Sequence, residues 1–325
     1  MSEKFLITGG QGFIGSWIAK RLIQEGVPAV LFDLSPDNNI LSQVLEPDEL
    51  GELERIFGDV SDAEKVRRVV DGEGVTHIVH LAGIQVPGCR RDPVHGARVD
   101  VLGTLAVFEA ARTVLDQVKM IVYASSAAVA GKIEDYGGRI SDDARHVPMT
   151  HYGVFKAANE GNARVYFADA GISSVGLRPY TVYGVGREIG VTSAPTKAIK
   201  AAVLGRAYTI PFSGPTSFVY VEDLAEVFIR AARSGHEGAV ALNIRGQVET
   251  VSEFLARLCE VLPETGRRIT CEGDPVPIAF DFDESGLEAL LGSDVPRTAI
   301  REGIQRTVDH FERLARSRRL HDRDL

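Results

Sequence analysis

The stretch Thr8–Gly15, TGGQGFIG, decides the fold of this 325-residue chain. It satisfies the pattern G-x-x-G-x-x-G through Gly9, Gly12 and Gly15, and an overlapping G-x-G-x-x-G that starts at Gly10. An apolar run, KFLIT, leads into it, and apolar residues at helical spacing follow it. A glycine-rich turn that ends a strand and opens a helix is typical of a dinucleotide-binding site.

Each glycine of this turn has a physical task in holding a dinucleotide. Gly9 can take the positive φ of a tight turn, and Gly12 lets the backbone approach a pyrophosphate. Gly15 lets the helix pack close to the strand. The helix N-terminus, at Phe13 and Ile14, offers free N–H groups and a favourable dipole to the phosphates. We therefore predict that these five residues bind the cofactor.

Short apolar runs alternate with helical patterns through the first half of the chain. We expect strands at 4–8, 28–32, 55–58, 76–81, 118–124 and 173–178, and helices at 13–25, 97–114 and 152–170. Apolar strands separated by helices predict an α/β fold, a Rossmann-type doubly wound parallel sheet. We assign residues 1–180 to an NAD-binding domain and residues 181–325 to a smaller C-terminal substrate-binding lobe. Strand and helix segments near 217–246 are expected to return to the first domain.

The composition of the chain excludes several classes of protein. The net charge is −9, which gives no electrostatic footprint for nucleic acid or an anionic membrane. No apolar run approaches the roughly 18 residues of a membrane span, and the N-terminus lacks the pattern of a signal peptide. The 3 cysteines share no metal-ligand spacing, so we expect no metal, no disulfide framework and a cytoplasmic location. The charged C-terminal residues 318–325 are expected to fray.

Acidic residues follow two of the expected strands. Asp33 ends the second strand, where a carboxylate accepts hydrogen bonds from the adenosine ribose hydroxyls. It would repel a 2′-phosphate, and the next residues, Leu34–Asn38, contain no cation to hold one. We therefore predict NAD rather than NADP. Asp59 and Val60, at the end of the third strand, are candidates for contacts with the adenine amino group.

A second motif carries the chemistry. Tyr152 and Lys156 stand at positions i and i+4 of an expected helix, so both side chains lie on one face. A cation beside a phenol favours the phenolate form, which can remove a proton from a substrate hydroxyl. Lys156 can also bond the nicotinamide ribose. The Tyr152–Lys156 pattern is weak by itself, and its position after a loop that contains Ser125 and Ser126 strengthens it.

The motifs together resemble those of the extended short-chain dehydrogenases/reductases, the NAD-dependent epimerase/dehydratase family. The matching segments, in chain order, are TGGQGFIG, Asp33, Asp59-Val60, His80–Gly83, Tyr123–Gly131, Tyr152-x-x-x-Lys156, Leu177–Gly184 and Phe218–Asp223. The resemblance implies that Ser126 orients the substrate hydroxyl and that Leu81, Ala82 and Gly83 line the cofactor. It also implies a homodimer built on the helices at 97–114 and 152–170.

Some positions depart from the family pattern. Ala127 and Ala128 stand where sugar dehydratases of the family carry two carboxylates, so dehydration is not expected. Thr181 and Thr216 replace an Asn and an Arg that contact the diphosphate of nucleotide sugars in the family. Asp100 replaces an Asn on the cofactor side, and we keep it among the cofactor-binding candidates.

These departures shape the functional hypothesis. We predict an NAD-dependent dehydrogenase or epimerase acting on a secondary alcohol of a sugar, sugar acid or similar polyol that is not nucleotide-linked. The alternative is a nucleotide-sugar 4-epimerase similar to UDP-glucose 4-epimerase, in which Arg187, Lys197 or Arg206 compensates for the missing cation. A cofactor-sensing protein without catalysis is a further alternative. Candidate substrate contacts are Gln85, Ser126, Thr181, Thr192 and Ser193.

Overall fold

The computed structural model describes residues 2–266 and 268–325. Its centre is a seven-stranded sheet with the order β10-β6-β5-β4-β1-β2-β3, and every neighbouring pair is parallel. The strands are β1 (Phe5–Thr8), β2 (Ala29–Asp33), β3 (Glu54–Phe57), β4 (His77–His80), β5 (Met120–Ala124), β6 (Ser174–Arg178) and β10 (Ala239–Asn243). The predicted Rossmann-type parallel sheet is confirmed.

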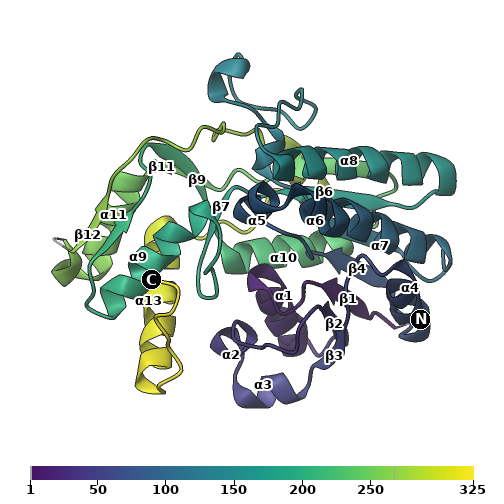
Figure 1. The fold of residues 1–325 in the computed structure, drawn as a ribbon, viewed down its shortest axis with the longest axis horizontal. Helices are drawn as coiled ribbons and strands as arrows, with labels where there is room; N and C mark the ends of the chain where they lie inside the picture. The colour runs from purple at the N-terminus through teal and green to yellow at the C-terminus, as the bar shows by residue number, and fades with distance from the viewer. Residues whose placement is uncertain (1, 267) are drawn as a thin grey trace.

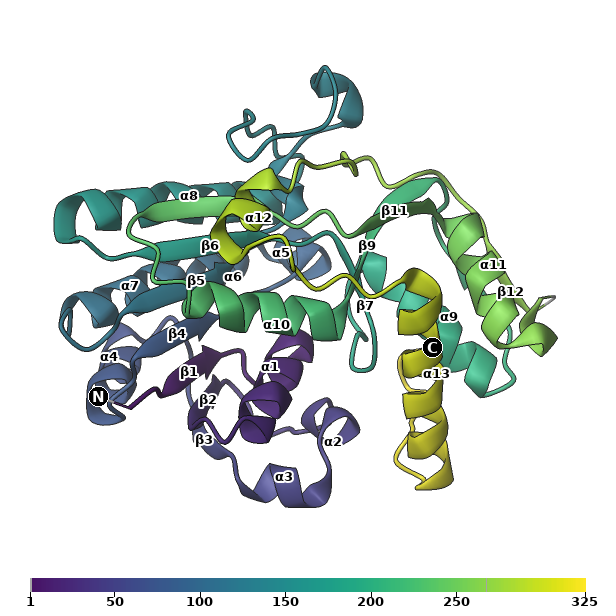
Figure 2. The same cartoon turned by 180° about the vertical axis from the view of Figure 1, so that it is seen from behind.

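Helices cover both faces of this sheet (Figures 1 and 2). One face carries α1 (Phe13–Gln24) and α10 (Val221–Ala232), and the other carries α4 (Ala63–Gly72), α7 (Gly103–Arg112) and α8 (His151–Ala170). Strand β1 shows why both faces are apolar: Phe5 and Ile7 pack into one core, and Leu6 packs into the other. No helix in the described ranges is long and apolar enough to cross a membrane.

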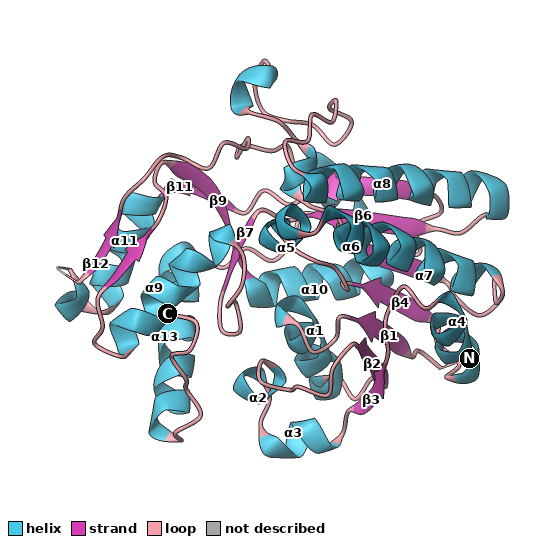
Figure 3. Cartoon of the chain, viewed as in Figure 1, coloured by secondary structure: helices cyan, strands magenta, loops and turns pink. Residues whose placement is uncertain are grey.

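Smaller sheets lie beyond the carboxyl ends of the central strands (Figure 3). One has the order β11 (Gln247–Thr250), β9 (Pro215–Tyr220), β7 (Thr181–Tyr183), and the other pairs β8 (Tyr208–Ile210) with β12 (Ile269–Cys271). The helices α9 (Ala194–Val203), α11 (Val251–Val261) and α13 (Ile300–Arg316) accompany them, and α12 (Ser285–Leu291) lies beside β10. Within the segment 217–246, β9 joins a small sheet whereas β10 completes the central one.

Several short elements carry no clear periodicity in the sequence. These are α2 (Leu41–Val44), α3 (Pro47–Gly51), α5 (Val86–Arg91) and α6 (Pro93–Ala97). The expected single helix at 97–114 is instead a π-helical turn at Arg98–Leu102 that continues into α7. Such π-turns occur often beside functional sites, and this one lies next to the end of β4 in space.

The C-terminal residues do not fray, which corrects the expectation from their charge. Lys200, almost fully buried on α9, holds Asp324 through a 2.7 Å contact from Nζ to Oδ1. Arg319 Nη1 donates to Glu46 Oε2 at 2.8 Å. Figure 1 places the C-terminus beside α9 and α13. A buried ammonium such as that of Lys200 needs a counter-charge. The charged residues that suggest a solvated tail therefore bind the tail to the rest of the protein.

Candidate active site

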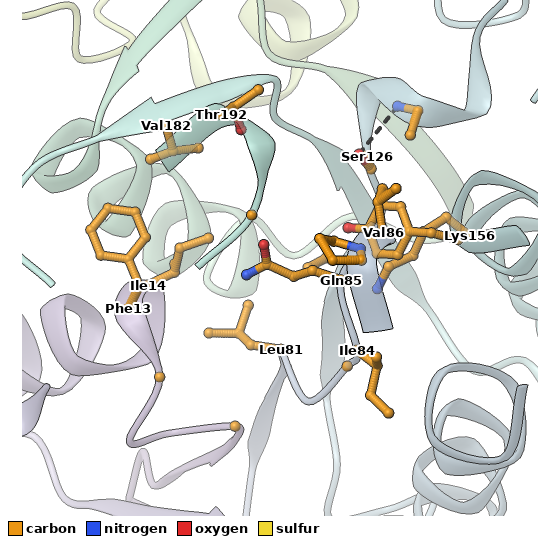
Figure 4. A pocket seen from close by; sticks show the side chains of 18 of the residues that line it. Phe13, Ile14, Leu81, Ile84, Gln85, Val86, Ser126, Lys156, Val182 and Thr192 are labelled. Carbon is orange, nitrogen blue, oxygen red and sulfur yellow. Dashed lines mark hydrogen bonds between the residues drawn. The ribbon is translucent and has the colours of Figure 1, made fainter. Parts of the chain in front are cut away.

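One cavity of about 1110 Å³ lies just beyond the carboxyl ends of β1 to β6. Its wall is made by residues 9, 11–15, 32–35, 58–60, 81–87, 124–126, 152, 156, 179–180, 182, 187, 190–192, 211–212 and 274–278, among others. Ligands of open α/β sheets bind at this edge. Figure 4 shows Phe13 and Ile14 on one side, Ser126 and Lys156 on the other, and Gln85 between them. The glycine turn and the Tyr152–Lys156 motif thus share one space.

The glycine turn has the shape that a pyrophosphate requires. Gly9 has a φ of +67°, and a Cβ there would lie 2.8 Å from the backbone nitrogen of Ala82. A Cβ on Gly15 would lie 2.6 Å from the carbonyl oxygen of Gly9. Gly12 is the N-cap of α1 and brings no side chain of its own to the helix N-terminus. The turn is therefore a cradle of backbone, open to phosphates at a helix N-terminus, and it fits NAD.

Two acidic side chains stand at the ends of β2 and β3. Asp33 Oδ2 accepts from the backbone N–H of Gln11 at 2.9 Å, and its Oδ1 accepts from that of Leu34 at 2.8 Å. Burial raises the pKa of Asp33, because these two bonds only partly offset the loss of water. Asp59 Oδ1 accepts from Ser61 at 2.8 Å. Both carboxylates are oriented and line the cavity, as contact with the adenosine end requires.

The helix α8 presents Tyr152 and Lys156 to the cavity. Thr150 caps the helix, and its hydroxyl accepts from the N–H of Gly153 at 3.0 Å. Lys156 is 5% exposed, and its Nζ lies 5.5 Å from the centre of the Tyr152 ring. A Cβ on Gly153 would lie 2.2 Å from the carbonyl oxygen of Ala128. Gly153 therefore lets the first turn of α8 press against the segment that follows Ser126.

Ser126 stands just after β5, next to a buried ionic network. Its hydroxyl oxygen accepts from the N–H of Ala128 at 3.1 Å. The preceding residue, Ser125, donates to Glu160 Oε1 at 2.5 Å, and Arg178 grips both oxygens of Glu160 at 2.8 and 2.7 Å. Burial alone would raise the pKa of Glu160, but the bonds from Arg178, His146 and Ser125 lower it to about 2. This network fixes the segment that carries Ser126 to α8 and β6.

Asp100, predicted as a cofactor contact, lies behind the cavity wall rather than in it. It is 1% exposed, and its Oδ1 accepts from the N–H of Ile84 at 2.6 Å. Burial raises the pKa of Asp100, and the nearby Lys156 acts in the opposite direction. A Cβ on Gly83 would lie 2.9 Å from Asp100 Oδ1 and 3.5 Å from Lys156 Nζ. Asp100 therefore supports the loop beside Lys156 from behind.

Two predicted substrate contacts also lie outside the cavity wall. The hydroxyls of Thr181 and Thr216 bond to each other at 2.8 Å, and neither side chain is more than 1% exposed. Ser193 is buried and donates to the carbonyl of Gly190 at 2.7 Å. The hydroxyls of Thr181 and Ser193 therefore bond within the protein rather than at the cavity wall. Gln85 and Thr192 line the cavity.

The sequence reasoning missed most of the wall opposite the glycine turn. Pro211, Phe212 and residues 274–278 line it, and Arg187 lies between Phe13 and Gln85. Residues 274–278 lie in a stretch notable in the sequence only for its acidity and prolines. No motif marks them, because they come together only when β8 pairs with β12.

Comparison with known proteins places the chain in a family. A family model described as the NAD dependent epimerase/dehydratase family matches residues 5–244. A curated UDP-glucose 4-epimerase of Azospirillum brasilense is 30% identical and spans 96% of this chain and 92% of its own length. The resemblance found in the sequence is confirmed, and so is NAD as the cofactor of the family.

Solved structures agree on the fold. The UDP-glucose 4-epimerase of Thermus thermophilus, in complex with NAD, has a TM-score of 0.79 at 28% identity and covers 95% of this chain and 99% of its own. A partial-consensus L-threonine 3-dehydrogenase has a TM-score of 0.82 at 23% identity, with coverage of 95% and 99%, which shows a shared fold alone.

Proposed function

The chain belongs to the NAD-dependent epimerase/dehydratase family, and from that premise we propose that it oxidises a secondary alcohol of a carbohydrate. The observation that carries this proposal is the single cavity that joins the glycine turn to Ser126, Tyr152 and Lys156. A cofactor-sensing protein would need the glycine turn alone. Here a base, a cation and a hydroxyl stand together at the other end of the same space.

The proposed cofactor site is the wall that follows β1 to β4. Gly9, Gly12 and Gly15, with the N–H groups of Phe13 and Ile14, would hold the pyrophosphate. Asp33 would accept from the adenosine ribose, and Asp59 and Val60 would face the adenine. Residues 81–83 would line the middle of the dinucleotide. NAD supplies a hydride acceptor when bound.

The proposed proton acceptor is the phenolate of Tyr152. It takes the proton of the substrate hydroxyl while the carbon that bears this hydroxyl loses a hydride, so a C–O single bond becomes a carbonyl. Ser126 holds the same hydroxyl in place through its own oxygen. The Nζ atom of Lys156 lies 5.5 Å from the centre of the Tyr152 ring, and Asp100 and Gly83 lie beside this ammonium group.

The nearby alanines argue against dehydration. Ala127 is fully buried and Ala128 is 6% exposed, and both lie in the turn beside Gly153. Elimination of water needs an acid and a base at the reacting carbons. Neither alanine can supply one. We therefore assign hydride transfer without elimination.

For the specific reaction, we propose 4-epimerisation of a nucleotide sugar, the alternative that the relatives support. Epimerisation returns the hydride to the opposite face of the same carbon, so the intermediate must turn while it stays bound. The cavity reaches beyond Tyr152 to Phe212 and residues 274–278, which gives room for a second ligand beside the cofactor.

A second candidate is net oxidation of a free sugar or sugar acid. The observation that favours it is the buried Thr181–Thr216 pair, which presents no cation to a diphosphate. Without that anchor, the keto product has fewer bonds to hold it for a second hydride transfer.

Titration calorimetry separates the two candidates. The NAD-loaded protein is titrated with UDP, with UDP-glucose and with glucuronate. Nucleotide-sugar epimerisation predicts that UDP binds at least as well as glucuronate, and that incubation with UDP-glucose yields UDP-galactose. Glucuronate binding together with net formation of NADH, and no binding of UDP, supports the second candidate. No heat with NAD itself would overturn the whole proposal.

The division of the chain and its assembly extend the proposal. We propose that residues 1–180 form the cofactor domain and residues 181–325 the substrate lobe, with α10 and β10 returned to the first; the packing of α10 against α1 supports this. We also propose a homodimer through the helices near α7 and α8, where Leu102, Val154, Val165 and Phe167 are exposed. Sedimentation as a monomer at micromolar concentration would contradict the dimer.

A further inference from the structure

Among the residues that the structure describes, no carboxylate pairs with Arg187, a cation in the cavity wall, and we propose that Arg187 binds a phosphate or carboxylate oxyanion there. This inference rests on the proposed function and names the residue that replaces the cation absent at Thr216. The oxyanion belongs either to the pyrophosphate of the cofactor or to the substrate. Both sources present the same chemistry, and the experiment below distinguishes them.

The hydrogen bonds of Arg187 leave its guanidinium only partly satisfied. Nη2 donates to the hydroxyl of Thr192 at 3.2 Å. Nη1 donates to Gln85 Oε1 at 3.2 Å, in the amide orientation that also lets Gln85 donate to Ile189 O at 3.0 Å. The Nε atom is buried and has no partner. Both partners are neutral, and an arginine has five N–H groups to satisfy.

The charge of Arg187 is also uncompensated. Across residues 2–266 and 268–325, no carboxylate lies within ion-pair distance of its guanidinium. Arg178, which is buried near the site, is instead held by both oxygens of Glu160. Burial lowers the pKa of Arg187 to about 10, so the group remains positive at neutral pH. Partial burial weakens the hydration of this positive charge, and a bound oxyanion offsets that loss through charge-assisted hydrogen bonds.

The position of Arg187 suits an anion that enters the cavity. Its guanidinium carbon lies 5.7 Å from the centre of the Phe13 ring, and Phe13 begins α1 directly after the glycine turn. On the other side of the guanidinium lie its partners Thr192 and Gln85, and Figure 4 shows Gln85 between Phe13 and Lys156. The guanidinium therefore lies between the glycine turn, where phosphates would bind, and the part of the cavity where an acidic group of the substrate would lie.

Two other cations, Lys197 and Arg206, could also compensate for the missing arginine, but both bind elsewhere. Lys197 donates to the carbonyl of Asp324, and Arg206 pairs with Asp322, so both hold the C-terminal residues. Neither lines the cavity. Arg90 lines it but is exposed, so water already compensates its charge. It offers a matched control for a substitution at Arg187.

The test compares Arg187→Gln and Arg90→Gln with the wild type by calorimetric titration of NAD, UDP and glucuronate. We expect Arg187→Gln to weaken the binding of at least one of them by about 10- to 100-fold, the usual cost of losing a charge-assisted bond. A loss with NAD identifies the pyrophosphate, and a loss with UDP or glucuronate identifies the substrate. Arg90→Gln should change each affinity less than threefold (about 0.6 kcal/mol).

A second readout is independent of the proposed reaction. Inorganic pyrophosphate should raise the melting temperature of the wild type more than that of Arg187→Gln, because the glycine turn remains in both. Wild-type affinities that survive in Arg187→Gln, with an unchanged pyrophosphate effect, overturn the inference and leave the proposed function intact. Absence of NAD binding by the wild type overturns the proposed function, and the pyrophosphate comparison then decides the anion site alone.

Discussion

The two walls of the cavity are built by different means. The wall after β1 to β4 is made largely of backbone: Gly9, Gly12 and Gly15 leave a cradle that any Cβ would fill. The facing wall is made of side chains from distant segments, among them Arg187, Phe212 and residues 274–278. The first wall suits a cofactor that all members of a family share, and the second suits a substrate that differs between them.

The difference teaches where specificity can be sought. A backbone cradle recognises phosphates through N–H groups and the helix dipole, so its own contribution to affinity depends on the glycine pattern. A wall of side chains recognises its ligand through the charge and shape of individual residues. The seam between the two walls holds Ser126, Tyr152 and Lys156, the residues that we propose carry out the chemistry.

The largest effect is expected at this seam. Tyr152→Phe removes the proton acceptor and should reduce turnover by about 10²- to 10⁴-fold. Both walls stay in place, so the dissociation constant for NAD should change less than threefold. Steady-state kinetics and calorimetry check the two halves of this prediction. Turnover within a few-fold of the wild type would break the comparison, because the seam would then carry no chemistry.

A large effect on stability is expected behind the side-chain wall. Glu160→Gln leaves Arg178 buried without a carboxylate and should lower the free energy of unfolding by about 3–5 kcal/mol. Urea denaturation measures it, and Glu264→Gln, at an exposed site, is the matched control. A loss below 1 kcal/mol would mean that this network does not hold the wall.

The carboxylate of Glu160 should also make the stability of the protein depend on pH in the acid range. Its pKa is about 2 in the folded protein and 4.5 ordinarily, so its contribution to stability is complete above pH 4.5. That contribution falls as the pH drops from 4.5 through 2. Wild type and Glu160→Gln should therefore differ in unfolding free energy at neutral pH and converge near pH 2. A difference that stays constant across this range would contradict the assignment.

The cofactor wall is tested by adding a single methyl group. Gly15→Ala places a Cβ 2.6 Å from the Gly9 carbonyl, where backbone must move, and we expect NAD affinity to fall about 10- to 100-fold. Gly72→Ala, at an exposed helix position with open space, is the control and should leave NAD affinity unchanged. Equal affinities in both variants would show that the cradle is not made by backbone.

The smallest effect is expected where a family anchor is absent. Thr216→Val leaves the Thr181 hydroxyl without its partner and should cost about 1–3 kcal/mol of stability. Because neither side chain lines the cavity, the affinities for UDP and glucuronate should stay within twofold. A selective loss of UDP affinity would place this pair in the binding site after all.

The sequence predicted the cofactor wall far better than the substrate wall, for a physical reason. The cofactor wall is built from local patterns: the alternating strands, the glycine turn and Asp33. Their spacing along the chain already determines how they lie in the structure. Thr181 and Ser193 lie outside the cavity wall, where their hydroxyls bond to Thr216 and to the Gly190 carbonyl, and a hydroxyl in a motif does not reveal which partner satisfies it. Residues 274–278 and the docked tail depend on pairings across long separations, which no local pattern records.

One measurement tests the central claim most directly. Wild type and Tyr152→Phe are mixed with NAD and a panel of UDP-sugars, free sugars and sugar acids, and the absorbance of reduced nicotinamide and the epimeric product are followed. The account predicts that the wild type reduces NAD or epimerises at least one of these compounds, and that Tyr152→Phe binds NAD equally but is inactive toward it. A wild type that binds NAD and turns over none of them, or a Tyr152→Phe protein as active as the wild type, would contradict it.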